Sequence, residues 1–163
     1  MGINIRLATI EDLDRVAYIE SICFPEAEAA SKKSLKRRLE NYPNCFWISE
    51  LNEEIIGFIN GMISNTENLI DEMYSDASLH DEAGDWQMIF GVDILPEYRK
   101  RGYAEILLKK VIEETRNRGK KGLVLTCKEH LLHYYEKFGF KNEGISGSEH
   151  GGVIWYQMRL IFW

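Results

Sequence analysis

The chain has 163 residues, a length that fits one domain with a sizeable hydrophobic core. Hydrophobic residues make up 45% and charged residues 28%, which argues against a disordered or fibrous chain. The formal net charge of −6 disfavours a general nucleic-acid surface, because such domains are usually basic, and it suits a cationic small molecule as partner.

The N-terminal residues and the cysteines bear on location and metal binding. The N-terminus lacks the basic-then-apolar layout of a signal peptide, and no apolar run is long enough to span a bilayer. We therefore expect a cytoplasmic protein with no membrane partner, and either a monomer or a homodimer. Cys23, Cys45 and Cys127 are far apart and include no CxxC pair, so we expect reduced thiols and no metal site.

The first half of the chain predicts one short strand, two helices and an antiparallel hairpin. These are a strand at 3–7, a helix from Thr9 to Cys23, a helix that carries Leu35 and Leu39 and stops before Pro43, and strands at 46–48 and 55–59 around a turn at Asn52-Glu53. The basic residues between Lys32 and Arg38 are interpreted as a solvated helix face.

The second half predicts a strong strand, an amphipathic helix and a final group of shorter elements. They are a short helix near 69–74, a strand at 86–95, a helix that starts near Gly102 and carries apolar residues to Ile112, a buried-type strand at 123–126, a short helix at 130–138, and strands at 140–145 and 153–160. This order indicates a mixed α/β sheet with helices on its faces.

A basic stretch lies between the strong strand and its helix. A helix N-terminus offers free backbone N–H groups and the positive end of the helix dipole, which together suit a pyrophosphate. Glycine lets the backbone approach such a ligand, because no side chain intervenes. A solvated basic turn is the alternative. The predicted phosphate-binding residues are Arg99, Lys100, Arg101, Gly102, Tyr103 and Ala104.

The sequence resembles the GCN5-related N-acetyltransferase (GNAT) family. The family pattern Arg/Gln-x-x-Gly-x-Gly/Ala matches Arg99, Gly102 and Ala104, and the run from Tyr135 to Phe140 matches a late family signature. The resemblance covers nearly the whole chain. It implies a single N-acetyltransferase domain over 1–163, a GNAT-type mixed, mostly antiparallel central sheet flanked by helices, and acetyl-CoA as acyl donor.

The resemblance also implies roles for residues in the two motif regions. The backbone of Val92, Asp93 and Ile94 is expected to pair with the pantetheine arm and to stabilise the oxyanion. Phe138 is expected to contact the cofactor. Tyr135 is expected near the cofactor sulfur, where its hydroxyl donates a proton to the departing thiolate; a core aromatic is the alternative.

A looser match resembles the arylalkylamine (serotonin-type) branch, and it departs from that branch at the general base. The match is carried by Leu125–Glu129, Tyr134–Phe140 and Phe24. That branch has two histidines on the central strand, where this chain has Met88 and Phe90, neither of which can take a proton.

Acidic residues elsewhere are therefore candidates for the base. Glu28, in the loop after the first helix, is the first candidate, and Glu26 is the second. Either carboxylate could instead bind the ammonium group or simply favour a helix start. Asp93 ranks lower, because it should alternate away from the side that Val92 and Ile94 share.

Aromatic side chains are expected to shape the acceptor site, although core packing is an equal alternative for them. The predicted acceptor-binding residues are Phe24, Glu28, Met88, Phe90 and Trp155. The predicted function is acetyl-CoA-dependent acetyl transfer, directly to a primary amine of a small molecule. The alternatives are a protein or peptide N-acetyltransferase and a non-catalytic acyl-CoA-binding module.

Overall fold

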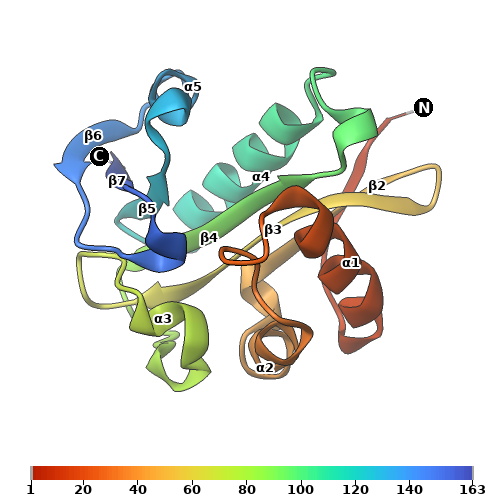
Figure 1. The fold of residues 1–163 in the computed structure, drawn as a ribbon, viewed down its shortest axis with the longest axis horizontal. Helices are drawn as coiled ribbons and strands as arrows, with labels where there is room; N and C mark the ends of the chain where they lie inside the picture. The colour runs from red at the N-terminus through yellow and green to blue at the C-terminus, as the bar shows by residue number, and fades with distance from the viewer. Residues whose placement is uncertain (1, 163) are drawn as a thin grey trace. The chain divides into compact units, whose positions relative to one another are not determined.

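The computed structural model describes residues 2–162, which form a mixed sheet of seven strands (Figure 1). The strand order is β1-β2-β3-β4-β5-β7-β6. The strands are β1 (Asn4–Leu7), β2 (Phe46–Leu51), β3 (Glu54–Ser64), β4 (Trp86–Ile94), β5 (Gly122–Cys127), β6 (Lys141–Ile145) and β7 (Tyr156–Ile161). β4 pairs with β5 in parallel, whereas β1–β2, β2–β3, β5–β7 and β6–β7 are antiparallel. The predicted mixed, mostly antiparallel sheet is confirmed.

Residues 2–162 also form five α-helices. These are α1 (Leu13–Cys23), α2 (Lys32–Asn41), α3 (Glu72–Ser75), α4 (Tyr103–Asn117) and α5 (Leu132–Glu136). Short 3-10 helices add η1 (Ile10–Asp12), η2 (Pro43–Cys45), η3 (Ala77–Leu79), η4 (Pro96–Tyr98), η5 (Glu129–Leu131) and η6 (His150–Gly152). Within this part of the chain, no helix is long and apolar enough to cross a membrane.

The predicted order of elements is confirmed, and the differences lie at element ends. The expected helix at 130–138 is divided into η5 and α5, and the last strand begins at Tyr156 instead of Val153. The later start has a local cause, because the segment before β7 folds back on itself. The indole Nε1 of Trp155 donates to the carbonyl of His150 at 2.7 Å.

The contacts of the chain divide it into two compact units. The first contains the chain up to Asn60 together with Gly91–Val111, and the second contains Gly61–Phe90 and the chain from Ile112 onward. The boundaries cross β3, β4 and α4. The single N-acetyltransferase domain over 1–163 stays a prediction.

The core of the first unit joins α1 and α2 to β2 and β3. Its fully buried side chains include Val16, Ile19, Leu35, Phe46 and Phe58. α1 and α2 pack side by side (Figure 1), and the two phenylalanine rings stack with centroids 5.3 Å apart. Burying each large apolar side chain contributes about 1.5–3 kcal/mol.

The hairpin turn between β2 and β3 forms as predicted, whereas one basic residue of α2 is buried instead of exposed. Asn52 and Glu53 have φ of 52° and 66°, as a two-residue hairpin loop requires. The prediction of a solvated basic face is wrong for Arg38, which is 3% exposed and donates Nη1 to Asn60 Oδ1 at 2.7 Å. Arg38 is three residues after the core residue Leu35, so it shares the buried face of α2.

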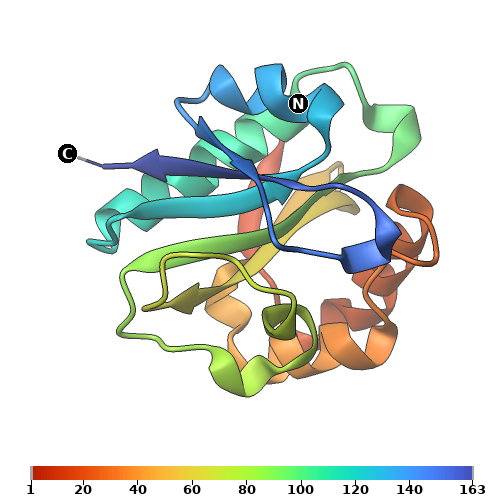
Figure 2. The same cartoon turned by 60° about the vertical axis from the view of Figure 1, so that its left-hand side comes forward.

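β5 is the central strand of the second unit. It pairs with β4 from Trp86↔Gly122 to Ile89↔Leu125, and with β7 along its whole length (Figure 2). Leu123, Val124 and Leu125 are buried, as predicted for a strand with neighbours on both sides. The end of β5 leads directly into η5 and α5, which carry the late signature of the sequence.

Candidate active site

The turn between β4 and α4 gives the basic stretch its shape. Gly102 has a φ of 85°, a left-handed conformation that glycine adopts without steric cost, and Lys100 has a φ of 63°. A Cβ placed on Gly102 would meet no atom within 4 Å. Glycine is therefore favoured here by the backbone conformation, and the space beside it is open to a ligand.

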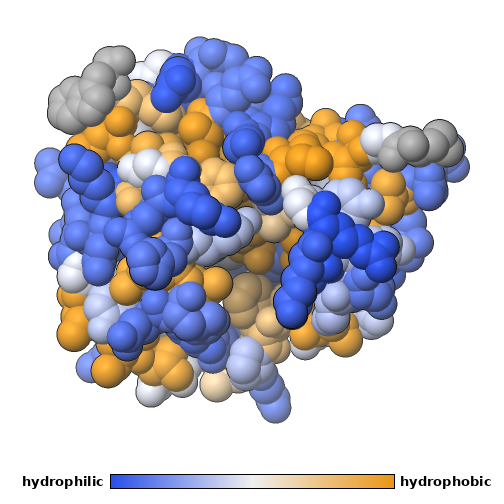
Figure 3. Space-filling view, turned by 90° about the horizontal axis from the view of Figure 1, so that it is seen from above, coloured by the Kyte–Doolittle hydropathy of each residue, from blue (hydrophilic) through white to orange (hydrophobic). Residues whose placement is uncertain are grey.

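The basic residues of this turn differ in how they are held. Lys100 and Arg101 are exposed. Strongly hydrophilic side chains gather on the face of the molecule that Figure 3 shows. Arg99 instead donates Nε to the carbonyl of Ile94 at 2.9 Å, which ties its guanidinium to the end of β4. The first turn of α4 adds backbone N–H groups and the positive end of the helix dipole.

The end of β4 is held firmly in the same unit as this turn. The Ile94 carbonyl also accepts the Cys23 thiol, with Sγ at 3.3 Å, and the Leu95 amide donates to the Ile56 carbonyl at 2.9 Å. A Cβ on Gly57 of β3 would lie 2.3 Å from the Asp93 carbonyl oxygen, so β3 approaches very closely. The residues predicted for the pantetheine and for the phosphates thus belong to one continuous segment of the first unit, whose β4 end is held by these contacts.

Two carboxyl groups are buried beside this segment. Asp93 is 0% exposed and Glu20, from α1, is 6% exposed. Apart from Glu20, no residue of 2–162 provides a hydrogen-bond partner for the carboxyl oxygens of Asp93. Glu20 lies within hydrogen-bonding reach of Asp93, but two carboxyl groups bond to each other only when one carries a proton.

The surroundings of Asp93 favour its protonated form. Burial raises the pKa of Asp93 well above its ordinary value, and the adjacent Glu20 and Cys23 raise it further. The buried guanidinium of Arg38 acts in the opposite direction, with the smallest influence of the four. Glu20 itself accepts the Ala30 amide at 2.8 Å. The cluster therefore retains a proton well above the pH at which an exposed aspartate loses it.

Glu20 was absent from the predicted site, although the sequence carries a signal for it. Val16, Ile19 and Cys23 mark the inward face of α1 at helical spacing, and Glu20 lies on that same face. An acidic residue on an apolar helix face must find a partner inside the protein. The identity of that partner, Asp93, depends on how α1 packs on β4.

The segment after α1 brings a predicted acceptor residue close to Asp93. A Cβ on Gly91 would lie 3.0 Å from Asp93 Oδ1 and 3.6 Å from Cζ of Phe24, so the ring and the carboxyl flank the same glycine. Glu28 lies in the turn that follows Pro25 and is 9% exposed. Phe24 and Glu28 thus share the first unit with the basic turn before α4, whereas Glu26 is exposed to solvent.

Tyr135 and Phe138 belong to an aromatic cluster of the second unit. Tyr135 is 8% exposed and packs edge-on against Tyr134 and Phe140, with ring centroids 5.2 Å and 5.9 Å away. Phe138 packs edge-on against Tyr134 at 5.3 Å. This packing fixes the orientation of the Tyr135 ring, as either a proton donor or a core aromatic requires.

The remaining acceptor candidates are connected by two rings that the sequence did not single out. Tyr74 contacts Phe90, with centroids 5.0 Å apart, and stacks on His150 at 4.8 Å. His150 in turn faces Trp155 at 6.1 Å. Phe90 and Trp155, distant in sequence, therefore belong to one row of rings, whereas Met88 is fully buried in the core.

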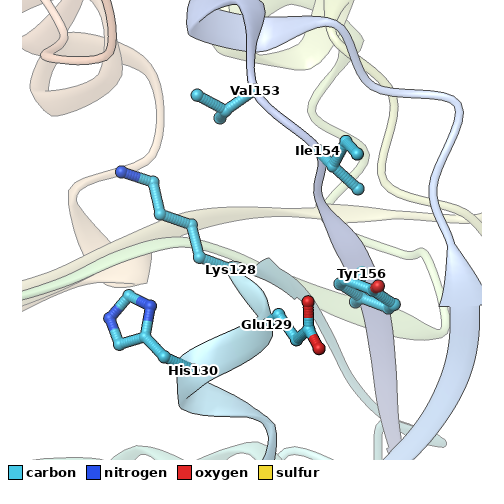
Figure 4. Close-up of a pocket in the computed structure, with 6 residues that line it drawn as sticks. All are labelled: Lys128, Glu129, His130, Val153, Ile154 and Tyr156. Carbon is cyan, nitrogen blue, oxygen red and sulfur yellow. The ribbon is translucent and has the colours of Figure 1, made fainter.

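A pocket of about 600 Å³ opens in the second unit, a volume typical of small-molecule sites (Figure 4). It combines charged and apolar side chains from η5 and from the segment leading into β7. Its lining residues are Lys128, Glu129, His130, Val153, Ile154 and Tyr156. The ammonium of Lys128 also lies 5.8 Å from the centre of the Trp155 ring, which connects the pocket to the row of rings.

The model of the acetyltransferase (GNAT) family matches residues 10–140. The chain belongs to the GNAT acetyltransferase family. This membership makes it an acyltransferase enzyme, and it agrees with the glycine turn before α4 and with the fold. No curated protein sequence matches the chain significantly.

Solved structures show the same GNAT fold. The loading GNATL domain of CurA from Lyngbya majuscula has a TM-score of 0.85 at 20% identity, over 99% of this chain and 98% of that one. The GphF GNAT-like decarboxylase in complex with isobutyryl-CoA has a TM-score of 0.84 at 20% identity, and the match covers 97% of this chain and 98% of that one. The ribosomal-protein-S18-alanine N-acetyltransferase from Escherichia coli has a TM-score of 0.74 at 20% identity, and the match covers 98% of this chain and 94% of that one.

The retained proton gives this GNAT protein a pH-dependent stability that Asp93→Asn should remove. Because the pKa of Asp93 is raised on folding, its contribution is present below the unfolded value of about 3.9 and is lost as pH rises through the folded pKa. We expect equal melting temperatures near pH 4, and a variant that melts about 3 °C or more above wild type at pH 8, or roughly 1 kcal/mol.

Scanning calorimetry between pH 4 and pH 8 checks this expectation. Asp14→Asn is the matched control, because the Asp14 side chain is exposed and should show no such pH-dependent difference. A difference between Asp93→Asn and wild type that stays constant over this range would contradict the retained proton.

Proposed function

We propose that the protein is an acetyl-CoA-dependent N-acetyltransferase that transfers the acetyl group directly to the primary amine of a small molecule. The observation that carries the proposal is the turn before α4, where Gly102 has a positive φ and open space beside it. Membership of the GNAT family and the similarity in fold to a protein in complex with isobutyryl-CoA support an acyl-CoA as donor.

The donor is expected to bind along the first unit. The pyrophosphate would lie on the N-terminal amides of α4, with the exposed Lys100 and Arg101 supplying charge. The pantetheine arm would follow the backbone of Val92, Asp93 and Ile94 towards the acetyl group. This assignment uses the segment that close packing against β3 holds in place.

Three chemical requirements follow from direct transfer. An alkyl ammonium with a pKa of about 10 is only ~0.1% neutral at pH 7, which corresponds to roughly 4 kcal/mol. The amine must therefore lose a proton, the oxyanion must be stabilised by a backbone N–H of β4, and the thiolate must gain a proton. Tyr135 is the proposed proton donor to the thiolate, because its ring is held rigidly by its neighbours.

A flat or aromatic amine fits the side chains best, and this is also what the arylalkylamine branch would use. The row that contains Phe90, Tyr74 and Trp155 offers aromatic faces, and Phe24 offers another in the first unit. A cationic acceptor also suits a chain with a net charge of −6. We propose a cytoplasmic location, where such amines and acetyl-CoA meet.

Release of free thiol from acetyl-CoA tests the proposal directly. We expect arylalkylamines to give the highest kcat/KM when they are compared with polyamines and with peptides that have a free N-terminus. Preferred release with peptides would replace the small-molecule acceptor by a protein. A reaction that yields carbon dioxide from a carboxyacyl-CoA, with no thiol release with any amine, would indicate a decarboxylase instead.

Gly102→Glu should abolish binding of acetyl-CoA. The substitution places a side chain and a negative charge at a left-handed position beside the predicted phosphates. Gly119→Glu is the matched control, because Gly119 at the other end of α4 has a similar φ of 77° and equally open surroundings. Acetyl-CoA should raise the melting temperature of wild type and of Gly119→Glu, and leave that of Gly102→Glu unchanged.

Tyr135→Phe should lower kcat by about 100-fold and leave the Kd for acetyl-CoA nearly unchanged, because only the proton donor is removed. Tyr134→Phe removes a hydroxyl from the neighbouring ring of the same cluster and should keep its turnover. Steady-state kinetics with calorimetric binding separates the two effects. Equal turnover in both variants would exclude Tyr135 from proton transfer.

A further inference from the structure

The proposed reaction needs a proton acceptor, and the usual place on the central strand does not supply one. Met88 is fully buried and Phe90 packs against Tyr74, and neither side chain takes a proton. Among the buried acidic side chains of the first unit, Glu20 and Asp93 lie next to each other. They lie at the strand end that carries the predicted pantetheine segment.

We propose that the carboxyl pair Glu20–Asp93 is the proton acceptor of the acetyl transfer, a role that rests on the proposed N-acetyltransferase function. Asp93 lies between Val92 and Ile94, whose backbone is assigned to the donor. Its Oδ1 also borders Gly91 on the side where Phe24, a predicted acceptor residue, meets the same glycine. Donor segment, acceptor ring and carboxyl thus converge within four residues of β4.

The charges around the pair fit this role. Asp93 is faced by Glu20 and Cys23 from α1 and by Arg38 from α2. The Arg99 guanidinium is instead bonded to the carbonyl of Ile94. With one proton on the pair, the negative charge of the remaining carboxylate and the positive charge of the Arg38 guanidinium cancel. Without that proton the cluster carries one net negative charge, which a nearby ammonium of the acceptor would compensate.

The pKa of Asp93 is raised, which is the direction that base catalysis requires. An exposed aspartate is too weak a base to take a proton from an ammonium group, whereas a base is most effective when its pKa lies near the working pH. Burial and the neighbouring carboxylate provide that increase in basicity. Phe24 and this carboxyl both lie next to Gly91, so an acceptor bound against the Phe24 ring would shield the site further from water.

The proton and bond changes balance as follows. The ammonium of the acceptor gives one proton to the ionised Asp93 carboxylate, and the neutral amine attacks the thioester carbonyl. A C–N bond forms, the C–S bond breaks, and the second proton of the nitrogen replaces the proton that Tyr135 gives to the thiolate. The products are the amide and free thiol, and the pair then releases its proton to solvent.

Asp93→Asn separates this role from a structural one. Asparagine copies the protonated aspartate in shape and donates a hydrogen bond to Glu20, so the packing of the cluster is preserved. We expect kcat to fall by about 100-fold, the rise of kcat with pH to disappear, and the Kd for acetyl-CoA to stay unchanged. A structural role alone would leave the pH–rate profile in place.

Glu20→Gln provides a second, opposite signature. It removes the negative charge beside Asp93 but keeps an oxygen that accepts the Ala30 amide. The pKa of Asp93 should fall, because one of the influences that raise it is lost. The rising limb of the pH–rate profile should therefore move to lower pH, in contrast to its loss in Asp93→Asn.

Thiol release at saturating acetyl-CoA, measured from pH 5 to pH 9.5 with one amine, decides between these outcomes. Asp14→Asn, at an exposed position on α1, should keep the wild-type profile. If wild type turns over and Asp93→Asn keeps its pH dependence, the pair is not the proton acceptor and the N-acetyltransferase function stands. If wild type releases no thiol with any amine, the proposed function fails, and the proton acceptor with it.

Discussion

Three ionisable side chains, Glu20, Arg38 and Asp93, are buried against the end of β4, and their charges must balance there. An unpaired charge in such surroundings would cost several kcal/mol, so burial and the neighbouring Glu20 favour the protonated form of Asp93. This charge balance links α1, which carries Glu20, and α2, which carries Arg38, to β4, the strand whose backbone is proposed to bind the acyl donor. Architecture and acid–base chemistry thus depend on one set of buried charges.

The two halves of the proposed reaction rely on different kinds of structure. The donor site depends mainly on backbone: a left-handed glycine, the amides of a helix N-terminus and a strand end pressed against β3. The residues proposed for the acceptor contribute side chains instead: Phe24 in the first unit, and in the second the row of rings that includes Phe90. Substitution of side chains can therefore change the acceptor substrate while the backbone features proposed for the acyl donor stay the same.

Local patterns predicted the elements well, because each depends on neighbours in sequence. Asn52-Glu53 formed the predicted hairpin turn, and Gly102 lies in the predicted turn before α4, with the positive φ that glycine adopts readily. Arg38 was wrongly placed in solvent, since its basic neighbours concealed that it shares a face with Leu35. Tyr74 and His150 were not singled out, because their contact with Phe90 and Trp155 joins segments far apart in the chain.

By itself, the sequence determined the order of elements, the glycine turn before α4 and the family, because these follow from residue type and spacing along a single stretch of chain. Only the tertiary structure decided that Asp93 faces Glu20 and that both are removed from water. The protonation of a carboxyl group depends on burial and on charges brought near it in space. The spacing of residues in the sequence indicates neither the burial of Asp93 nor the charges near it. The raised pKa of Asp93 therefore becomes apparent only when α1 is seen to pack on β4.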